Sequence, residues 1–144
     1  MVHLINDVRE VAFQSIDDAR GRLVVAEEQD HVGFPIRRMF SVSGVGPGET
    51  RGGHAHHQLS QLLVCMAGRV EVVCDDGSTK RTDVLDDPAK GLLVPPTIWS
   101  EQTYATAETI LTVLCDAPYD EADYVRDYPA FLELRRNLNE SSES

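Results

Sequence analysis

Short apolar segments separated by turn signals are the feature that most limits what this chain can fold into. Six segments of four to seven residues are rich in Val, Ile and Leu and are bounded by Gly, Pro or Asp, which is typical of β-strands. They are Leu23–Ala26, Arg37–Val42, Gln61–Met66, Arg69–Cys74, Gly91–Val94 and Thr109–Cys115. Because the turn signals recur at the short intervals of a sandwich or barrel, the sequence predicts an all-β fold.

The Asp75-Asp76-Gly77 stretch is the strongest hairpin signal in the chain. Asp-Gly favours the tight turns that join antiparallel strands. Polar and apolar residues partly alternate in the flanking segments Val70–Cys74 and Lys80–Val84. We therefore expect an antiparallel ribbon with one face toward water.

A helical pattern is found at the end of the chain. Pro129 suits the first turn of a helix, and Phe131, Leu134 and Leu138 follow at helical spacing. We expect a short C-terminal helix that packs one apolar stripe on the sheet or on a partner chain, and a flexible polar tail over residues 139–144. With no internal repeat or linker, residues 1–144 are predicted to form a single domain.

Composition excludes several classes of function. The net charge of −11 argues against a nucleic-acid partner, because phosphate backbones are bound by clustered Lys and Arg. The chain has neither an apolar run of about 18 residues nor the pattern of a secretory signal, so we expect a cytoplasmic protein without a membrane segment. Cys65, Cys74 and Cys115 each lie in an apolar run and are expected to be buried, reduced thiols.

The two histidines on either side of Ala55, in the stretch Arg51-Gly-Gly-His-Ala-His-His57, are the strongest functional signal. On a strand, residues two apart point to the same face and lie about 6.6 Å apart along the chain. His54 and His56 are therefore expected on one face, and His57 on the other. Imidazole titrates near neutral pH, so such a pair suits metal binding or proton transfer.

The spacing around this pair resembles the first motif of the cupins, small jelly-roll barrels with a double-stranded β-helix. Gly48, His54, His56, Gln61 and Gly68 match the pattern G-x5-H-x-H-x4-E-x6-G at every position except the glutamate, which is Gln61 here. Metal-binding cupins use that glutamate and a third histidine from a later strand, where this chain has Ser100. Since an amide is a poor ligand, we expect no metal.

Nearly the whole chain is similar to the sugar nucleotide 3,4-ketoisomerases, cupins that act on dTDP-4-keto-6-deoxyhexoses. The matching signatures are Arg-Gly-x-His-Ala-His at residues 51–56, Gln61 with its Leu-Leu-Val-Cys strand, Asp75-Asp76-Gly77, Pro-Pro-x-x-Trp at residues 95–99, and the stretch Tyr119–Tyr128. The resemblance implies a homodimer without a cofactor, with a thymidine diphosphate sugar in each barrel. It implies that the carbonyl moves from C4 to C3 through an enediolate, in the synthesis of a deoxyamino sugar.

The resemblance also implies roles for individual residues. His54 is the leading candidate to carry the carbon-bound proton, and His56 to exchange protons with the sugar oxygens. Arg51 is expected to grip the diphosphate, since a guanidinium binds phosphate with two hydrogen bonds. Gln61 is expected to bond a sugar oxygen or to orient an imidazole.

Other residues are expected near the substrate. At most one of the adjacent Arg37 and Arg38 is expected to enter the pocket, with Arg38 the candidate, because neighbours on a strand face opposite ways. Trp99 is expected as barrel wall at the rim of the pocket. Ser100 replaces the histidine that usually follows the tryptophan and keeps one hydrogen bond, whereas Phe40 replaces a tyrosine and can only pack.

Three alternative functions are also consistent with parts of the sequence. A C3 or C5 epimerase of the same substrate class would deprotonate beside the ketone and return the proton to the same carbon. A metal-dependent oxygenase would need the ligands that Gln61 and Ser100 replace. A non-catalytic cupin that binds a nucleotide sugar is also consistent with Ser100 and Phe40.

Overall fold

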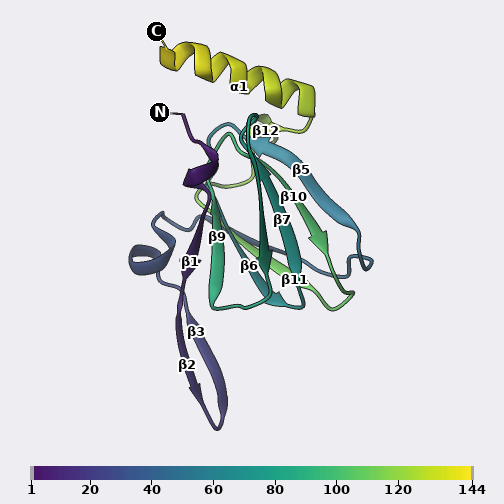
Figure 1. Ribbon diagram of the computed structural model, residues 1–144. Helices are drawn as coiled ribbons and strands as arrows, with labels where there is room; N and C mark the ends of the chain where they lie inside the picture. The colour runs from purple at the N-terminus through teal and green to yellow at the C-terminus, as the bar shows by residue number, and fades with distance from the viewer. Residues whose placement is uncertain (1, 144) are drawn as a thin grey trace.

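The structure is a computed structural model that describes residues 2–143. Its elements, shown in Figure 1, are two 3-10 turns, a single π-helical turn, twelve strands and one α-helix. In chain order they are η1 (Ile5–Asp7), β1 (Arg9–Ala12), β2 (Gln14–Asp18), β3 (Gly21–Val25), η2 (Glu28–Val32), β4 (Arg38–Val42), β5 (Thr50–His56), β6 (Gln61–Ala67), β7 (Val70–Asp75), β8 (Lys80–Leu85), β9 (Lys90–Val94), β10 (Trp99–Tyr104), β11 (Ile110–Cys115), η3 (Glu121–Asp123), β12 (Tyr124–Val125) and α1 (Tyr128–Glu143).

Two antiparallel sheets form the body of the molecule. One has the strand order β1-β9-β6-β11-β4 and the other the order β12-β5-β10-β7-β8. Their facing sides share a core of aliphatic residues, cysteines and one tyrosine, among them Leu63, Val72, Leu92, Tyr104 and Val113. The predicted all-β jelly roll with a C-terminal helix is confirmed.

The three cysteines lie in this core as free thiols. Burial raises the pKa of the Cys65, Cys74 and Cys115 thiols, so each stays protonated and acts as a small apolar side chain.

The hairpin predicted at Asp76-Gly77 joins β7 to β8, with Cys74 paired to Arg81 and Asp75 to Lys80. The Asp75 carboxylate accepts a hydrogen bond of 2.7 Å from the Gly77 N–H, and Gly77 has a positive φ of 93°. A turn of this kind favours glycine because a side chain would strain the backbone.

Strands β2 and β3 form an arm that extends away from both sheets (Figure 1). They pair with each other in register, with Ile16 opposite Leu23. Both side chains are about half exposed, at 47% and 57%. The arm thus places an apolar pair outside the core of its own chain.

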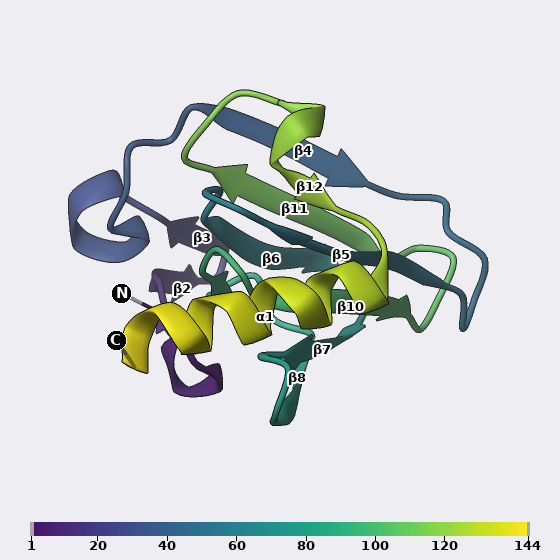
Figure 2. The same ribbon diagram turned by 90° about the horizontal axis from the view of Figure 1, so that it is seen from above.

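Helix α1 lies across one end of the two sheets (Figure 2). It starts at Tyr128, one residue before the predicted Pro129, and buries Phe131 fully against Trp99 and Tyr128. Burying an aromatic side chain of this size stabilises the fold by about 1.5–3 kcal/mol. The helix continues through residues 139–143, where the sequence favoured a flexible tail. Within residues 2–143, no helix combines the length and the apolar character needed to cross a membrane.

Candidate active site

One cavity lies between the two sheets and is called the His54 cavity here. Apolar residues of β4, β6 and β11 form part of its wall, including Phe40, Leu63 and Val113. Its polar lining includes Arg51, His54, Gln61, Gln102, Tyr124 and Arg126. Strand β5 supplies Arg51 and His54, so the histidine motif itself brings a cation and an imidazole to the same cavity.

A second cavity, the His56 cavity, lies on the other side of Tyr124. Its lining includes Arg38, His56, Asp123 and Tyr124. Tyr124 is the residue common to both cavities, because β12 pairs with β5 and sets Tyr124 opposite His56. The two cavities therefore meet at one aromatic ring.

The imidazoles of His54 and His56 are direct neighbours, as the alternation of side chains along a strand predicts. Their ring centroids lie 5.1 Å apart with the planes nearly perpendicular, at 84°. The Tyr124 ring contacts both, at 5.1 Å from His54 and 4.3 Å from His56. The three rings form one packed cluster, which holds both imidazoles in fixed orientations.

Asp123 holds the His56 ring in place through Nδ1. Its Oδ2 lies 3.1 Å from His56 Nδ1, and its two oxygens also accept hydrogen bonds from the backbone N–H groups of Gln58 and Leu59. An ionised carboxylate only accepts hydrogen bonds, so Nδ1 carries the proton and Nε2 keeps its lone pair. Among the described residues, neither His56 Nε2 nor His54 Nδ1 has a hydrogen-bond partner, although both atoms are buried.

Both imidazoles are held in the neutral form. Burial lowers the pKa of His54, and the positive charge of Arg126 lowers it further. Burial also lowers the pKa of His56, and so does the neighbouring His54, while Asp123 opposes the shift. A neutral imidazole can accept a proton, so the pair is ready to act as base at neutral pH.

Arg126 covers the outer side of the Tyr124 ring, with its guanidinium carbon 4.1 Å from the ring centre. Glu121 holds the guanidinium with two hydrogen bonds, from Nε at 2.7 Å and from Nη2 at 2.9 Å. This pairing lowers the pKa of the Glu121 carboxyl to about 2 and raises that of Arg126. The Arg126 guanidinium is therefore held in place at the border of the His54 cavity, paired with a carboxylate.

Comparison with known proteins places this arrangement in a family. Residues 6–136 match the family described as FdtA: WxcM-like, C-terminal. The chain belongs to this family. It is 38% identical over 129 residues to the TDP-4-oxo-6-deoxy-alpha-D-glucose-3,4-oxoisomerase of Aneurinibacillus thermoaerophilus. The aligned region covers 90% of this chain and 93% of that enzyme.

Solved structures agree with this assignment. The sugar 3,4-ketoisomerase QdtA of Thermoanaerobacterium thermosaccharolyticum, in complex with TDP, superposes with a TM-score of 0.89 at 30% identity, over 93% of this chain and 98% of that one. A variant of QdtA has been solved with TDP-4-keto-6-deoxyglucose. A 3,4-ketoisomerase from Helicobacter canadensis has a TM-score of 0.87 at 32% identity, over 90% and 98%. The resemblance to the sugar nucleotide 3,4-ketoisomerases, and with it the prediction of an isomerase, is confirmed.

Within this FdtA-like chain, three of the expected substrate-binding residues border the two cavities. Arg51 and Gln61 line the His54 cavity, and Arg38 lines the His56 cavity. Arg38 lies over the rings of Phe40 and Tyr119, at 5.2 and 5.6 Å, whereas Arg37 is exposed. Arg38 thus borders one of the two cavities and Arg37 borders neither.

Trp99 and Ser100 differ from their expected positions, since neither borders the His54 or the His56 cavity. Trp99 packs against Tyr128 and Phe131 of α1, with ring centroids at 5.2 and 5.6 Å, and is thus wall beneath the helix. Ser100 is buried, and its Oγ accepts a 3.0 Å hydrogen bond from Gln102 Nε2. Ser100 therefore does not line the cavity itself, but it holds Gln102, which does.

Several residues of the two cavities were not identified from the sequence, among them Gln102, Asp123, Tyr124 and Arg126. In the sequence, the stretch Tyr119–Tyr128 stands out only as one of the matching signatures. The available signal was its density of Asp, Tyr and Arg residues, which alone does not reveal that β12 adds to β5 beside His56.

Residues 2–143 contain no cluster of three or more His, Cys, Asp or Glu side chains placed to hold a metal ion.

Proposed function

We propose that this protein is a 3,4-ketoisomerase of a dTDP-4-keto-6-deoxyhexose. The observation that carries the proposal is the His54–His56 pair, whose rings lie 5.1 Å apart beside a cavity that Arg51 and Arg126 also border. The 38% identity to an enzyme named for this reaction supports the same substrate class.

The proposed reaction is an internal redistribution of two protons. A base removes the proton from C3, which gives an enediolate across C3 and C4. A proton leaves O3 and another is delivered to O4, and a proton then returns to carbon at C4. The product has its carbonyl at C3 and a hydroxyl at C4, so atoms and charge balance without an oxidant or a cofactor.

His54 is the proposed carrier of the carbon-bound proton, and His56 the proposed partner of the sugar oxygens. His54 lines the cavity and is neutral, as removal of the C3 proton requires. Asp123 holds His56 through Nδ1, and His56 Nε2 has no hydrogen-bond partner within residues 2–143. A group that exchanges protons between two oxygens has to keep one orientation, and Asp123 supplies it.

Arg51 and Arg126 are proposed to bind the diphosphate. They line the same cavity as His54 in a chain whose net charge is −11. Both guanidinium groups can donate hydrogen bonds to the oxygens of a dianion, and the diphosphate would share Arg126 with Glu121. Gln61 and Gln102 are proposed to bond sugar hydroxyls.

The arm of β2 and β3 supports a homodimer. Ile16 and Leu23 are 47% and 57% exposed on the arm, and Met39 and Met66 are 64% and 50% exposed on the sheet that contains β4 and β6. A second copy that covered these exposed apolar side chains would stabilise the dimer by removing them from water. Sedimentation equilibrium tests this, and a monomer at micromolar concentration contradicts it.

Incubation of the protein with dTDP-4-keto-6-deoxyglucose, followed by NMR of the product, tests the function. A 3-keto product supports it. A product that is still a 4-ketone with inverted C3 or C5 identifies an epimerase instead. Saturable binding without a product identifies a binding protein.

A further inference from the structure

We propose that Arg135 of α1 is a positioning residue for His56 and acts through Thr97. This inference rests on the proposed function, since it concerns how the imidazole pair is held. Neither Arg135 nor Thr97 borders the His54 or the His56 cavity.

Thr97 has an unusual backbone conformation. Its φ is +67°, and no other non-glycine residue within residues 2–143 has a positive φ. For a β-branched residue this region is strained. Residues held in such conformations persist only where their surroundings enforce them, and they concentrate at functional sites.

The strained residue holds the peptide group that follows His56. The Thr97 N–H donates a 2.7 Å hydrogen bond to the His56 carbonyl, and the N–H of the same peptide, from His57, donates a 2.9 Å bond to the Asp123 carbonyl. The peptide is thus fixed at both edges. Asp123 also holds the side chain of His56, through a hydrogen bond with Nδ1.

Arg135 enforces the conformation of Thr97. Its side chain is buried, with the residue only 3% exposed, and its Nη1 donates to both the carbonyl oxygen and the Oγ1 of Thr97, each at 3.2 Å. The Thr97 hydroxyl in turn donates to the Pro96 carbonyl at 2.5 Å. A buried cation is costly unless it is hydrogen-bonded or paired with opposite charge. Both hydrogen bonds of the Arg135 side chain go to Thr97, and the charges of Asp76 and Asp75 act on it as well.

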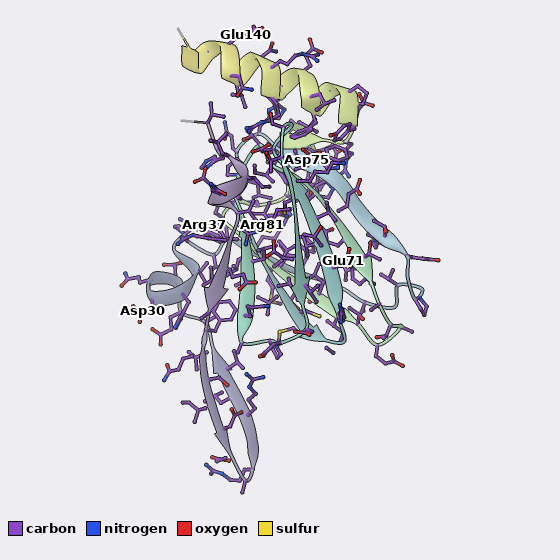
Figure 3. The ribbon with its side chains drawn as sticks, viewed as in Figure 1. Asp30, Arg37, Glu71, Asp75, Arg81 and Glu140 are labelled. Carbon is purple, nitrogen blue, oxygen red and sulfur yellow. The ribbon has the colours of Figure 1, made fainter. Side chains whose placement is uncertain are left out.

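The turn between β7 and β8 keeps Arg135 in place. The space beside Gly77 is filled by Arg135, so that a Cβ on Gly77 would lie 3.0 Å from Arg135 Cγ. Asp75 lies just below α1 in Figure 3, and its Oδ2 accepts a 2.6 Å bond from the Tyr128 hydroxyl. The helix, the turn and the Thr97 loop therefore form one connected support for the end of β5.

The test uses the full chain and three variants. Arg135→Met removes the donors and keeps a similar stem, and Arg135→Lys restores one donor. Thr97→Gly tolerates the positive φ without the hydroxyl, and it provides a second approach if Arg135→Met does not fold. Arg136→Met, at the exposed neighbouring position, is the matched control.

Two measurements are made on each protein. In turnover of dTDP-4-keto-6-deoxyglucose, we expect Arg135→Met and Thr97→Gly to lower kcat by about 10- to 100-fold, as misplacement of a reacting group by about 1 Å does, with KM nearly unchanged. Arg135→Lys should recover part of kcat. In ¹⁵N NMR, the imidazole signals of His56 should shift in the same two variants, while those of His3 and His31 stay in place.

Wild-type kcat in Arg135→Met and Thr97→Gly, or a change in KM alone, would overturn the inference. If wild-type protein shows no turnover, the proposed function fails separately, and the NMR signals decide: His56 signals that stay unchanged in both variants refute the positioning role.

Discussion

Asp123 Oδ2 lies 3.1 Å from His56 Nδ1, and the Asp123 carbonyl oxygen accepts the N–H of His57. One residue thus holds both the side chain and the following peptide of the same histidine. It comes from a segment 67 residues further along the chain.

Asp123→Asn is expected to lower kcat by about 100-fold, a loss typical of a disturbed general acid or base. The amide can donate a hydrogen bond from its NH2 group to Nδ1. This favours the His56 tautomer that carries its proton on Nε2, so Nε2 can no longer accept a proton. Steady-state kinetics measure the effect. Asp30→Asn, exposed on η2, is the control, and equal kcat values for the two variants would show that Asp123 has no catalytic influence.

Activity is expected to fall on the acid side of the pH profile. Burial lowers the pKa of both histidines below 6.5, so the neutral, base-competent forms dominate at pH 7 and are lost at lower pH. A profile of kcat/KM should therefore be flat near pH 7 and decline with an inflection below 6.5. An inflection above 7 would contradict a buried neutral pair.

The same shifts predict the sign of the stability change. The unfolded chain binds protons at these histidines more tightly than the folded chain does. The stability that the two neutral histidines contribute is therefore fully present above pH 6.5, and it is lost as the pH falls through their lowered folded-state pKa values. Denaturant unfolding of wild type and His56→Gln checks this. Below pH 6.5 the variant should lose less stability, and parallel curves would argue against the shift at His56.

Arg126→Met is expected to raise KM for the nucleotide sugar by about 10-fold with a small change in kcat, because a residue that binds the diphosphate stabilises substrate and transition state alike. Calorimetric titration with TDP measures the same loss directly. Arg37→Met, exposed and outside both cavities, is the control. Unaltered TDP affinity in Arg126→Met would remove Arg126 from the binding site.

Gly52→Ala is expected to damage both stability and activity. A Cβ at Gly52 would clash with Gln102 Oε1 and lie 3.1 Å from the Ser100 carbonyl oxygen, whereas Gly44, which also has a positive φ, has open space. Gly44→Ala should cost about 1 kcal/mol, and Gly52→Ala about 2 kcal/mol more from crowding. Urea unfolding compares the two. Equal costs would mean that Gln102 moves aside freely.

The sequence predicts those parts of the fold and site that local patterns determine. Alternation along a strand suffices to place His54 and His56 together, and helical spacing suffices to bury Phe131. Strand β10 was missed because Trp-Ser-Glu-Gln-Thr-Tyr has no apolar run, although its residues alternate in burial. Tyr124 and Asp123 reach the histidines through a two-residue strand, a long-range pairing that no local pattern encodes.

The most direct test of the central claim is a proton NMR time course with dTDP-4-keto-6-deoxyglucose in deuterated water. We predict a 3-keto product, with deuterium or the transferred hydrogen at C4, and no product with His54→Asn. A retained 4-ketone that gains deuterium only at C3 or C5, or an unchanged spectrum despite saturable binding, would contradict the assignment of His54 and His56 as the groups that move the carbonyl.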